Sequence, residues 1–98
     1  MKYELKSKDM EMTDAIRDHL DKSVSKLDKF YNNITNAHFD VGMISHHHHK
    51  GKIFRAEGNL NVPGKLLRAE STNEDLYHAI DEMVSKLKRE LITYKETH

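Results

Sequence analysis

The spacing of apolar residues changes along this chain, from every second residue to every third or fourth and back again. Side chains on a β-strand alternate between two faces, whereas those on a helix return to the same face after three or four residues. A segment with one of these periods cannot adopt the other structure without moving apolar side chains into water. Six such segments follow one another, in the order strand, helix, strand, strand, strand, helix.

Four segments show the period of two that is typical of strands with one buried face. They begin near residues 2, 34, 54 and 65. The polar stretch of residues 46–51 predicts a hairpin between the second and third strands, and Pro63-Gly64 predicts a turn before the fourth. The residues expected on the buried face are Tyr3, Leu5, Ala37, Phe39, Val41, Met43, Phe54, Ala56, Gly58, Leu60, Val62, Leu67, Ala69 and Ser71.

Two segments carry apolar residues at helical spacing. Thr13 is a suitable N-cap for the first helix, and the Asn32-Asn33 pair predicts its end. The stretch from Thr72 to Asp75 fits a capping box that opens the second helix. The expected buried stripes consist of Ile16, Leu20, Val24, Leu27 and Tyr31 in the first helix, and of Leu76, Ile80, Met83, Val84, Leu87, Leu91 and Tyr94 in the second.

These six segments predict an α+β fold. A four-stranded mixed sheet with both helices packed on one face buries every apolar face and stripe together. The helical crossover makes the first two strands parallel if they are neighbours, and the hairpins make the other pairs antiparallel. Each helix then runs antiparallel to the strand before it. In this βαβββα arrangement the two helices are parallel, and their carboxyl ends lie at the same edge of the domain.

Length and composition fit a single domain and exclude several classes of protein. Ninety-eight residues can build one hydrophobic core, so residues 1–98 are expected to form one domain. The absence of cysteine excludes disulfides and thiolate metal sites. No apolar run reaches the roughly 18 residues of a membrane span, so the expected location is the cytoplasm. Sixteen basic residues balance sixteen acidic ones, which excludes a uniformly basic nucleic-acid binder.

The charges are nevertheless unevenly placed along both predicted helices. Six acidic residues and one basic residue occupy the leading halves, whereas the trailing halves hold seven basic and three acidic residues. The seven basic residues are Lys22, Lys26, Lys29, Lys86, Lys88, Arg89 and Lys95. Parallel helices would therefore give the domain an acidic end and a basic end. Part of this pattern complements the helix dipoles, but three lysines on one face of the first helix exceed that need and favour contact with a phosphate backbone.

A run of four histidines is the other candidate site. Imidazole binds zinc, nickel and copper, but adjacent residues in a strand or tight loop point to opposite sides, so at most two can reach one ion. We expect a solvated hairpin tip with only adventitious metal binding at His46, His47, His48 and His49. Nucleophile elbows, phosphate-binding loops and paired catalytic carboxylates are absent from the sequence, so we expect neither catalysis nor a cofactor.

Several stretches of the chain together match the pattern of a known family. The first half contains Met12-Thr13-Asp14-Ala15-Ile16 and Lys26-Leu27-Asp28-Lys29-Phe30, and the second half contains Leu67-Arg68-Ala69-Glu70, Asp75-Leu76-Tyr77-His78-Ala79-Ile80-Asp81 and Lys86-Leu87-Lys88-Arg89-Glu90-Leu91. Over essentially its whole length the chain resembles the ribosome hibernation promoting factor family, which includes the ribosome-associated inhibitor. The Asp-hydrophobe-Tyr-x-Ala-Ile-Asp stretch is quite specific, whereas the lysine pattern alone is weak.

The resemblance implies a domain that binds the small ribosomal subunit between head and body, overlaps the messenger and transfer RNA sites, and inhibits translation in stationary phase or stress. It implies that six of the helix cations contact 16S ribosomal RNA, namely Lys22, Lys26, Lys29, Lys86, Lys88 and Arg89. The charge pattern adds Lys95 to this set, and we add Arg68, Lys50 and Lys52 as secondary RNA contacts. The chain resembles the short form, without a further dimerisation domain, and is expected to be a monomer off the ribosome. In some bacteria the short form cooperates with ribosome modulation factor, which is a second candidate partner.

Two other functions remain open at the level of sequence. A general double-stranded RNA-binding domain can use a similar α/β arrangement, and it would bind any RNA duplex as well as ribosomes. A metal-storage or metal-sensing protein would instead use the histidine run, and Zn²⁺ calorimetry distinguishes it from both RNA binders.

Overall fold

The computed structural model describes residues 1–44 and 51–97, which form four strands and two helices. The strands are β1 (Lys2–Lys8), β2 (Asn36–Ile44), β3 (Ile53–Val62) and β4 (Lys65–Asn73). The helices are α1 (Asp14–Phe30) and α2 (Leu76–Thr97). This order confirms the predicted βαβββα fold. Across the same ranges, no helix combines the length and the apolar character that a membrane span requires.

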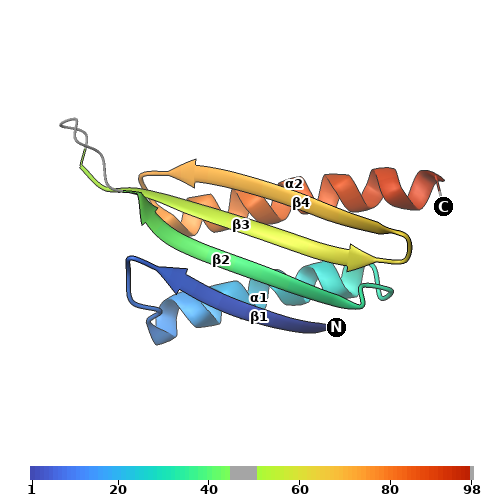
Figure 1. Ribbon diagram of the computed structural model, residues 1–98, viewed down its shortest axis with the longest axis horizontal. Helices are drawn as coiled ribbons and strands as arrows, with labels where there is room; N and C mark the ends of the chain where they lie inside the picture. Colours follow the sequence, from blue (N-terminus) through green and yellow to red (C-terminus); the bar gives the residue numbers. More distant parts are fainter. Residues whose placement is uncertain (45–50, 98) are drawn as a thin grey trace.

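The four strands form one mixed sheet in the order β1-β2-β3-β4. Strand β1 is parallel to β2, and the other neighbours are antiparallel. Both helices cover the same face of this sheet and run in the same direction, so their carboxyl ends lie at the same edge, as predicted (Figure 1). The Pro63-Gly64 turn lies at that edge too, because the Tyr94 hydroxyl near the end of α2 donates a 2.6 Å hydrogen bond to the Pro63 carbonyl.

The hydrophobic core lies between the helices and the covered face of the sheet. Most residues expected there are buried, and eleven of the larger side chains have a relative exposure below 2%. Tyr3 on the edge strand is 37% exposed. Five more of the expected core residues are only partly buried, so all six lie at the margin of the core: Leu5, Tyr31, Met43, Phe54 and Val84. The periods of two and of three to four residues therefore predicted the buried face correctly, apart from its borders.

Gly58 in the middle of β3 lets α2 approach the sheet closely. A Cβ atom at this position would lie 2.7 Å from Leu87 Cδ1 and 2.7 Å from Met83 Sδ, both on α2, and 3.0 Å from Phe39 Cδ1 on β2. These distances are shorter than ordinary van der Waals contacts, so any larger residue would push against the helix or the neighbouring ring. The absence of a side chain at Gly58 therefore allows α2 to pack directly against the sheet at this position.

The helix starts agree with the sequence in one case and differ in the other. The Thr13 hydroxyl accepts a 3.2 Å hydrogen bond from the Ile16 amide, which confirms Thr13 as the N-cap of α1. The capping box predicted from Thr72 was wrong, because β4 continues through Asn73 and keeps Thr72 in the sheet. Instead the Asp75 carboxylate accepts hydrogen bonds from the backbone amides of Tyr77 and His78, so Asp75 caps α2.

Candidate nucleic-acid interface

The two helices are joined side by side near their beginnings by a polar contact. His19 of α1 lies 2.8 Å from the Asp81 carboxylate of α2, measured from Nε2 to Oδ1. The ring of Tyr77 packs edge-on against His19, with centroids 4.9 Å apart. Tyr77 and Asp81 belong to the family-like stretch in the second half of the sequence, and their spacing of four residues places both on the α1 side of α2. The stretch therefore aligns the two helices.

A groove of about 420 Å³ opens between the helices next to this contact. Three of the predicted RNA-binding residues line it, namely Lys22 and Lys26 from α1 and Lys88 from α2. The side chains of Ser23 and Ser85 add hydroxyl donors, and Leu27 and Val84 form apolar parts of the lining. The lining contains three cations and one carboxylate, that of Asp81. The groove therefore carries a net positive charge and offers hydrogen-bond donors, which suits a phosphate-bearing ligand.

Near the carboxyl ends of the two helices, lysines of α2 contact an aromatic ring of α1. Phe30 lies in the last turn of α1, and the ammonium groups of Lys88 and Lys95 on α2 lie 5.1 and 4.6 Å from its ring centroid. The neighbouring rings of Tyr31 and Tyr94 pack edge-on at 5.8 Å. Lys95, at the basic end as predicted, is therefore held near Lys88 by an aromatic side chain.

A second basic cluster lies on the other side of α2, facing β4. Arg68 from β4 and Lys86 and Arg89 from α2 line a shallow hollow of about 500 Å³, together with one carboxylate, Glu90. Residues two positions apart on a helix differ in direction by about 200°, so Lys86 and Lys88 point to opposite sides of α2. The predicted basic end therefore consists of two clusters that α2 separates. We call them the groove cluster (Lys22, Lys26 and Lys88) and the edge cluster (Arg68, Lys86 and Arg89).

The members of the edge cluster differ in how freely they can bind a ligand. The Lys86 ammonium donates a 2.8 Å hydrogen bond to the backbone carbonyl of Glu70, at the free edge of β4. Arg68 donates to the Glu57 carboxylate at 2.5 Å. In the described part of the chain, Arg89 has neither contact, and it is the member of this cluster that is most available to an anion.

The remaining predicted RNA contacts lie elsewhere. Lys29 is exposed in the last turn of α1 and lines neither the groove nor the edge hollow. Lys52 directly precedes β3, so it lies at the end of the domain where both helices begin, far from their carboxyl ends (Figure 1). Lys50 and the four histidines His46, His47, His48 and His49 lie outside the described residues. Within the described ranges, no three His, Asp or Glu side chains gather as metal ligands.

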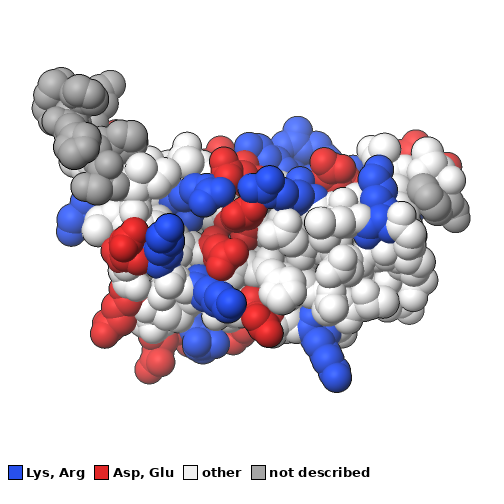
Figure 2. Space-filling model, in the orientation of Figure 1, with Lys and Arg blue, Asp and Glu red and all other residues white. Residues whose placement is uncertain are grey.

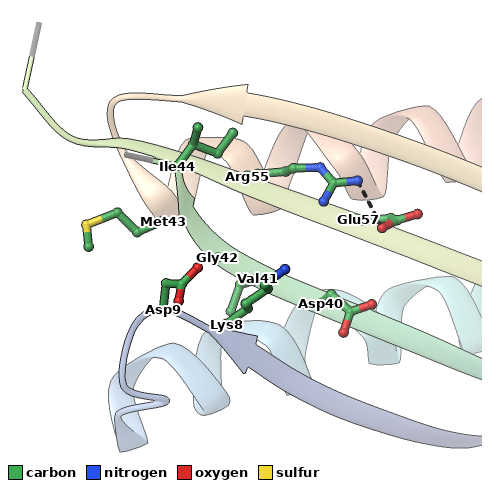
Figure 3. Close-up of a pocket in the computed structure, with 9 residues that line it drawn as sticks. All are labelled: Lys8, Asp9, Asp40, Val41, Gly42, Met43, Ile44, Arg55 and Glu57. Carbon is green, nitrogen blue, oxygen red and sulfur yellow. Dashed lines mark hydrogen bonds and ion pairs between the residues drawn. The ribbon is translucent and has the colours of Figure 1, made fainter. Parts of the chain in front are cut away.

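The uncovered face of the sheet has a different electrostatic character. Figure 2 shows it with cations and carboxylates interleaved over the strands and no broad area of one sign. A hollow of about 530 Å³ lies there, beside the end of β1 (Figure 3). Its charged lining residues are Lys8, Arg55, Asp9, Asp40 and Glu57, so carboxylates outnumber cations. This hollow is therefore poorly suited to RNA, and the covered side with its helices is the better candidate interface.

Arg55 holds an ion-pair ladder together on the same uncovered face. Its guanidinium donates to Glu70 on β4, with Nε 2.8 Å from Oε2, and to Glu57 at 3.2 Å. The hydrogen bonds from Arg55 hold the pKa of Glu70 below its usual 4.5, and the pKa of Arg55 is raised in turn. The charges of the ladder therefore largely compensate one another on the uncovered face. Arg68 of the edge cluster also pairs with Glu57, so its charge is partly compensated.

Glu70 should therefore make stability depend on pH in the acid range. Its contribution is fully present above pH 4.5 and is lost as the pH falls through its lowered pKa. Because the side chain is 45% exposed, we expect less than about 1 kcal/mol. Urea unfolding between pH 7 and pH 3 should show a smaller acid loss for Glu70→Gln than for the wild type. Glu96→Gln, outside the ladder, is the control, and identical profiles for Glu70→Gln and the wild type would contradict the prediction.

Sequence reasoning missed the residues that organise the interface. His19 has no sequence neighbour that marks it as a contact residue, and Phe30 enters the sequence argument only within the family-like stretch that it ends. Both become visible once α1 and α2 are known to be adjacent, because their partners are far away in sequence. The spacing of Lys88 and Lys95, seven residues apart on one face of α2, was a signal for a shared contact that only the position of α1 completes.

Comparisons with known proteins show which family this chain is similar to. Residues 3–98 match the family model of the Sigma 54 modulation protein / S30EA ribosomal proteins. The chain is 32% identical over 93 residues to a ribosome hibernation promotion factor of Deinococcus radiodurans, covering 95% of this chain and 48% of that one. A protein of the same name from Staphylococcus aureus is 32% identical over 95 residues, covering 97% and 48%. The chain thus spans about half the length of the curated relatives it matches.

Solved structures show the same fold. The N-terminal domain of Thermus thermophilus Protein Y superposes with a TM-score of 0.82 at 33% identity, covering 96% of this chain and 99% of that domain. A ribosomal subunit interface protein from Coxiella burnetii superposes with a TM-score of 0.83 at 21% identity, which supports the fold alone. The family match extends over nearly every residue of the chain, and the fold agrees with it. The chain therefore belongs to the Sigma 54 modulation protein / S30EA ribosomal protein family.

Proposed function

We propose that this protein is a ribosome hibernation factor that binds the small ribosomal subunit in the channel for messenger and transfer RNA and thereby inhibits translation. Its partner surface would be 16S ribosomal RNA, and binding would be stoichiometric rather than catalytic. The observation that carries the proposal is the pair of basic clusters along α2, in a domain with no net charge. The names of the curated relatives, ribosome hibernation promotion factors, support the same role.

The separation of the two clusters favours folded ribosomal RNA over a simple duplex. The groove cluster and the edge cluster lie on opposite sides of α2, so one flat or convex RNA surface would not meet both. A site with phosphates on two sides of the helix would meet both at once. Such a site exists where RNA segments from different parts of a large particle come together, and an isolated duplex does not offer it.

Co-sedimentation with purified small subunits through a salt series tests the proposal. A patch that neutralises several phosphates should lose affinity by orders of magnitude between about 50 and 200 mM salt. A short RNA duplex, examined in parallel by gel shift, should bind far more weakly. Absence of pelleting at low salt would refute the proposal, and equal affinity for the duplex would indicate a general double-stranded RNA binder instead. In a translation extract, added protein should lower the yield in proportion to its ratio to ribosomes.

A further inference from the structure

The contact between Phe30 and two lysines has no counterpart elsewhere among the described residues. Lys88 and Lys95 are the two described lysines with an ammonium group within about 5 Å of the Phe30 centroid, at 5.1 and 4.6 Å, and Lys95 is also 6.0 Å from the Tyr31 ring. Neither ammonium has a carboxylate partner in the described ranges. A phenyl ring attracts a cation through its quadrupole without carrying a charge of its own. The ring therefore holds both lysines and leaves their positive charges uncompensated.

This arrangement differs from that of an ordinary surface lysine. A lysine side chain moves among many rotamers in water, and fixing it costs conformational entropy when it binds a ligand. A salt bridge would fix it too, but the carboxylate would cancel the charge that an anion needs. Contact with a ring occupies one side of the ammonium group and leaves N–H donors on the other side available. Lys88 also lines the groove between the helices, so the ring holds a member of the groove cluster.

We infer that Phe30 is a positioning residue for RNA binding, because its ring orients Lys88 and Lys95 toward the same stretch of phosphate backbone before the RNA arrives. The inference rests on the proposed function and deepens it: the ligand is a phosphodiester chain, and the site is the junction of the two helix ends. Phe30 is half-buried in the last turn of α1, and the next residue, Tyr31, packs edge-on against Tyr94 of α2, which ties this end of α1 to α2. The lysines come from α2, so the site forms only when both helices are docked.

Proton NMR of the free protein tests the contact itself. Protons above the face of an aromatic ring are shifted upfield, so the ε-methylene protons of Lys88 and Lys95 should resonate upfield of those of the other lysines. Phe30→Leu should abolish the shift, and Phe30→Tyr should preserve it. Tyr77→Leu is the matched control, because Tyr77 is a half-exposed aromatic residue that packs on His19 rather than on a lysine. Normal lysine shifts in the wild type would overturn the inference.

Binding measurements test the consequence for RNA. Phe30→Leu should bind small subunits about fivefold more weakly than the wild type, whereas Phe30→Tyr should be within about twofold. The slope of log affinity against log salt should stay unchanged in Phe30→Leu, because the number of neutralised phosphates is the same, while Lys88→Met should lower it by about one. A merely structural role would not produce upfield ε-methylene shifts at Lys88 and Lys95 that Phe30→Leu abolishes and Phe30→Tyr keeps. Equal or tighter binding by Phe30→Leu would overturn the inference.

Titration with inorganic polyphosphate keeps this inference separate from the proposed function. If the wild type does not bind ribosomes, the proposed function fails, yet the positioning role still predicts weaker polyphosphate binding by Phe30→Leu than by Phe30→Tyr. If the wild type binds ribosomes and all three proteins bind polyphosphate and ribosomes equally, the positioning role fails and the proposed function stands. Circular dichroism at the temperature of each assay confirms that every variant is folded.

Discussion

Reversing two charges in the groove cluster, in Lys26→Glu/Lys88→Glu, should lower the affinity for small ribosomal subunits by on the order of 100-fold or more, because like charges brought together cost several kcal/mol. Both side chains are exposed and line the groove from different helices, so the substitutions place two carboxylates where phosphates are expected. The salt dependence of binding should weaken as well, so the slope of log affinity against log salt should fall in magnitude by about two. Co-sedimentation at several salt concentrations measures both effects.

A matched control changes the same charge on the opposite side of the sheet. Lys2 and Lys6 are exposed on β1 and alternate with Tyr3, which faces α1 and donates a hydrogen bond to Asp21 there. Lys2→Glu/Lys6→Glu therefore alters net charge by the same amount on the uncovered face. It should retain most of the affinity. Equal losses in the two double variants would mean that net charge, and not the groove, determines binding.

The edge cluster requires a different variant. Lys86→Glu would place a carboxylate against the Glu70 carbonyl that Lys86 now bonds, so a loss of binding could reflect local damage to the edge of β4. Arg89→Glu avoids this problem, because Arg89 has no such contact among the described residues. If α2 inserts between two phosphate-bearing surfaces, Arg89→Glu should weaken binding in addition to the groove variant. No loss in Arg89→Glu would restrict the interface to the groove side.

The fold could be predicted from the sequence because its determinants are local. Hydrophobic period is a property of short windows, and the short connections allow few ways of joining the strands. The start of α2 was the exception. Thr72, Asn73 and Asp75 can all cap a helix, and the choice depends on how long β4 stays paired with β3, since the register pairs Arg55 with Thr72. Strand pairing is a tertiary interaction, and it overrode the local capping pattern.

The site could be predicted only in part, for a related reason. The direction of the helices was predicted correctly, so their carboxyl ends lie at one edge as expected. The basic residues of α2 divide between its two sides according to the rotation of the helix about its axis. The buried stripe determines that rotation, and a count of charges along the sequence does not include it. Phe30 and His19 are recognised only through partners on another helix, 58 and 62 residues away. Such pairs form only when the helices pack together, so no short stretch of the sequence predicts them.

Filling the space at Gly58 should destabilise the domain strongly. In Gly58→Val the new Cβ would lie 2.7 Å from Leu87 Cδ1 and Met83 Sδ and 3.0 Å from the Phe39 ring, and its two methyl groups would need still more room. All three neighbours are fully buried, so they cannot move into solvent. We expect a loss of about 3 kcal/mol or more in the free energy of unfolding, which is a large part of the stability of a domain this size. Urea unfolding measures it.

A second substitution tests whether the contact between residue 58 and α2 causes the loss of stability. Leu87→Ala alone should cost about 2–5 kcal/mol, because it removes a fully buried side chain and leaves a cavity. In Gly58→Val/Leu87→Ala the valine methyls enter that cavity, so the double variant should be more stable than the sum of the single losses by about 1–3 kcal/mol. Leu20→Ala removes an equally buried leucine of α1 that is not among the three nearest neighbours of that position, and with Gly58→Val it should be additive. Lys88 lines the groove and Arg89 lines the edge hollow, so returning α2 to its position should also restore part of the affinity for ribosomes. Additivity at Leu87 would instead show that Gly58 does not set the position of the helix.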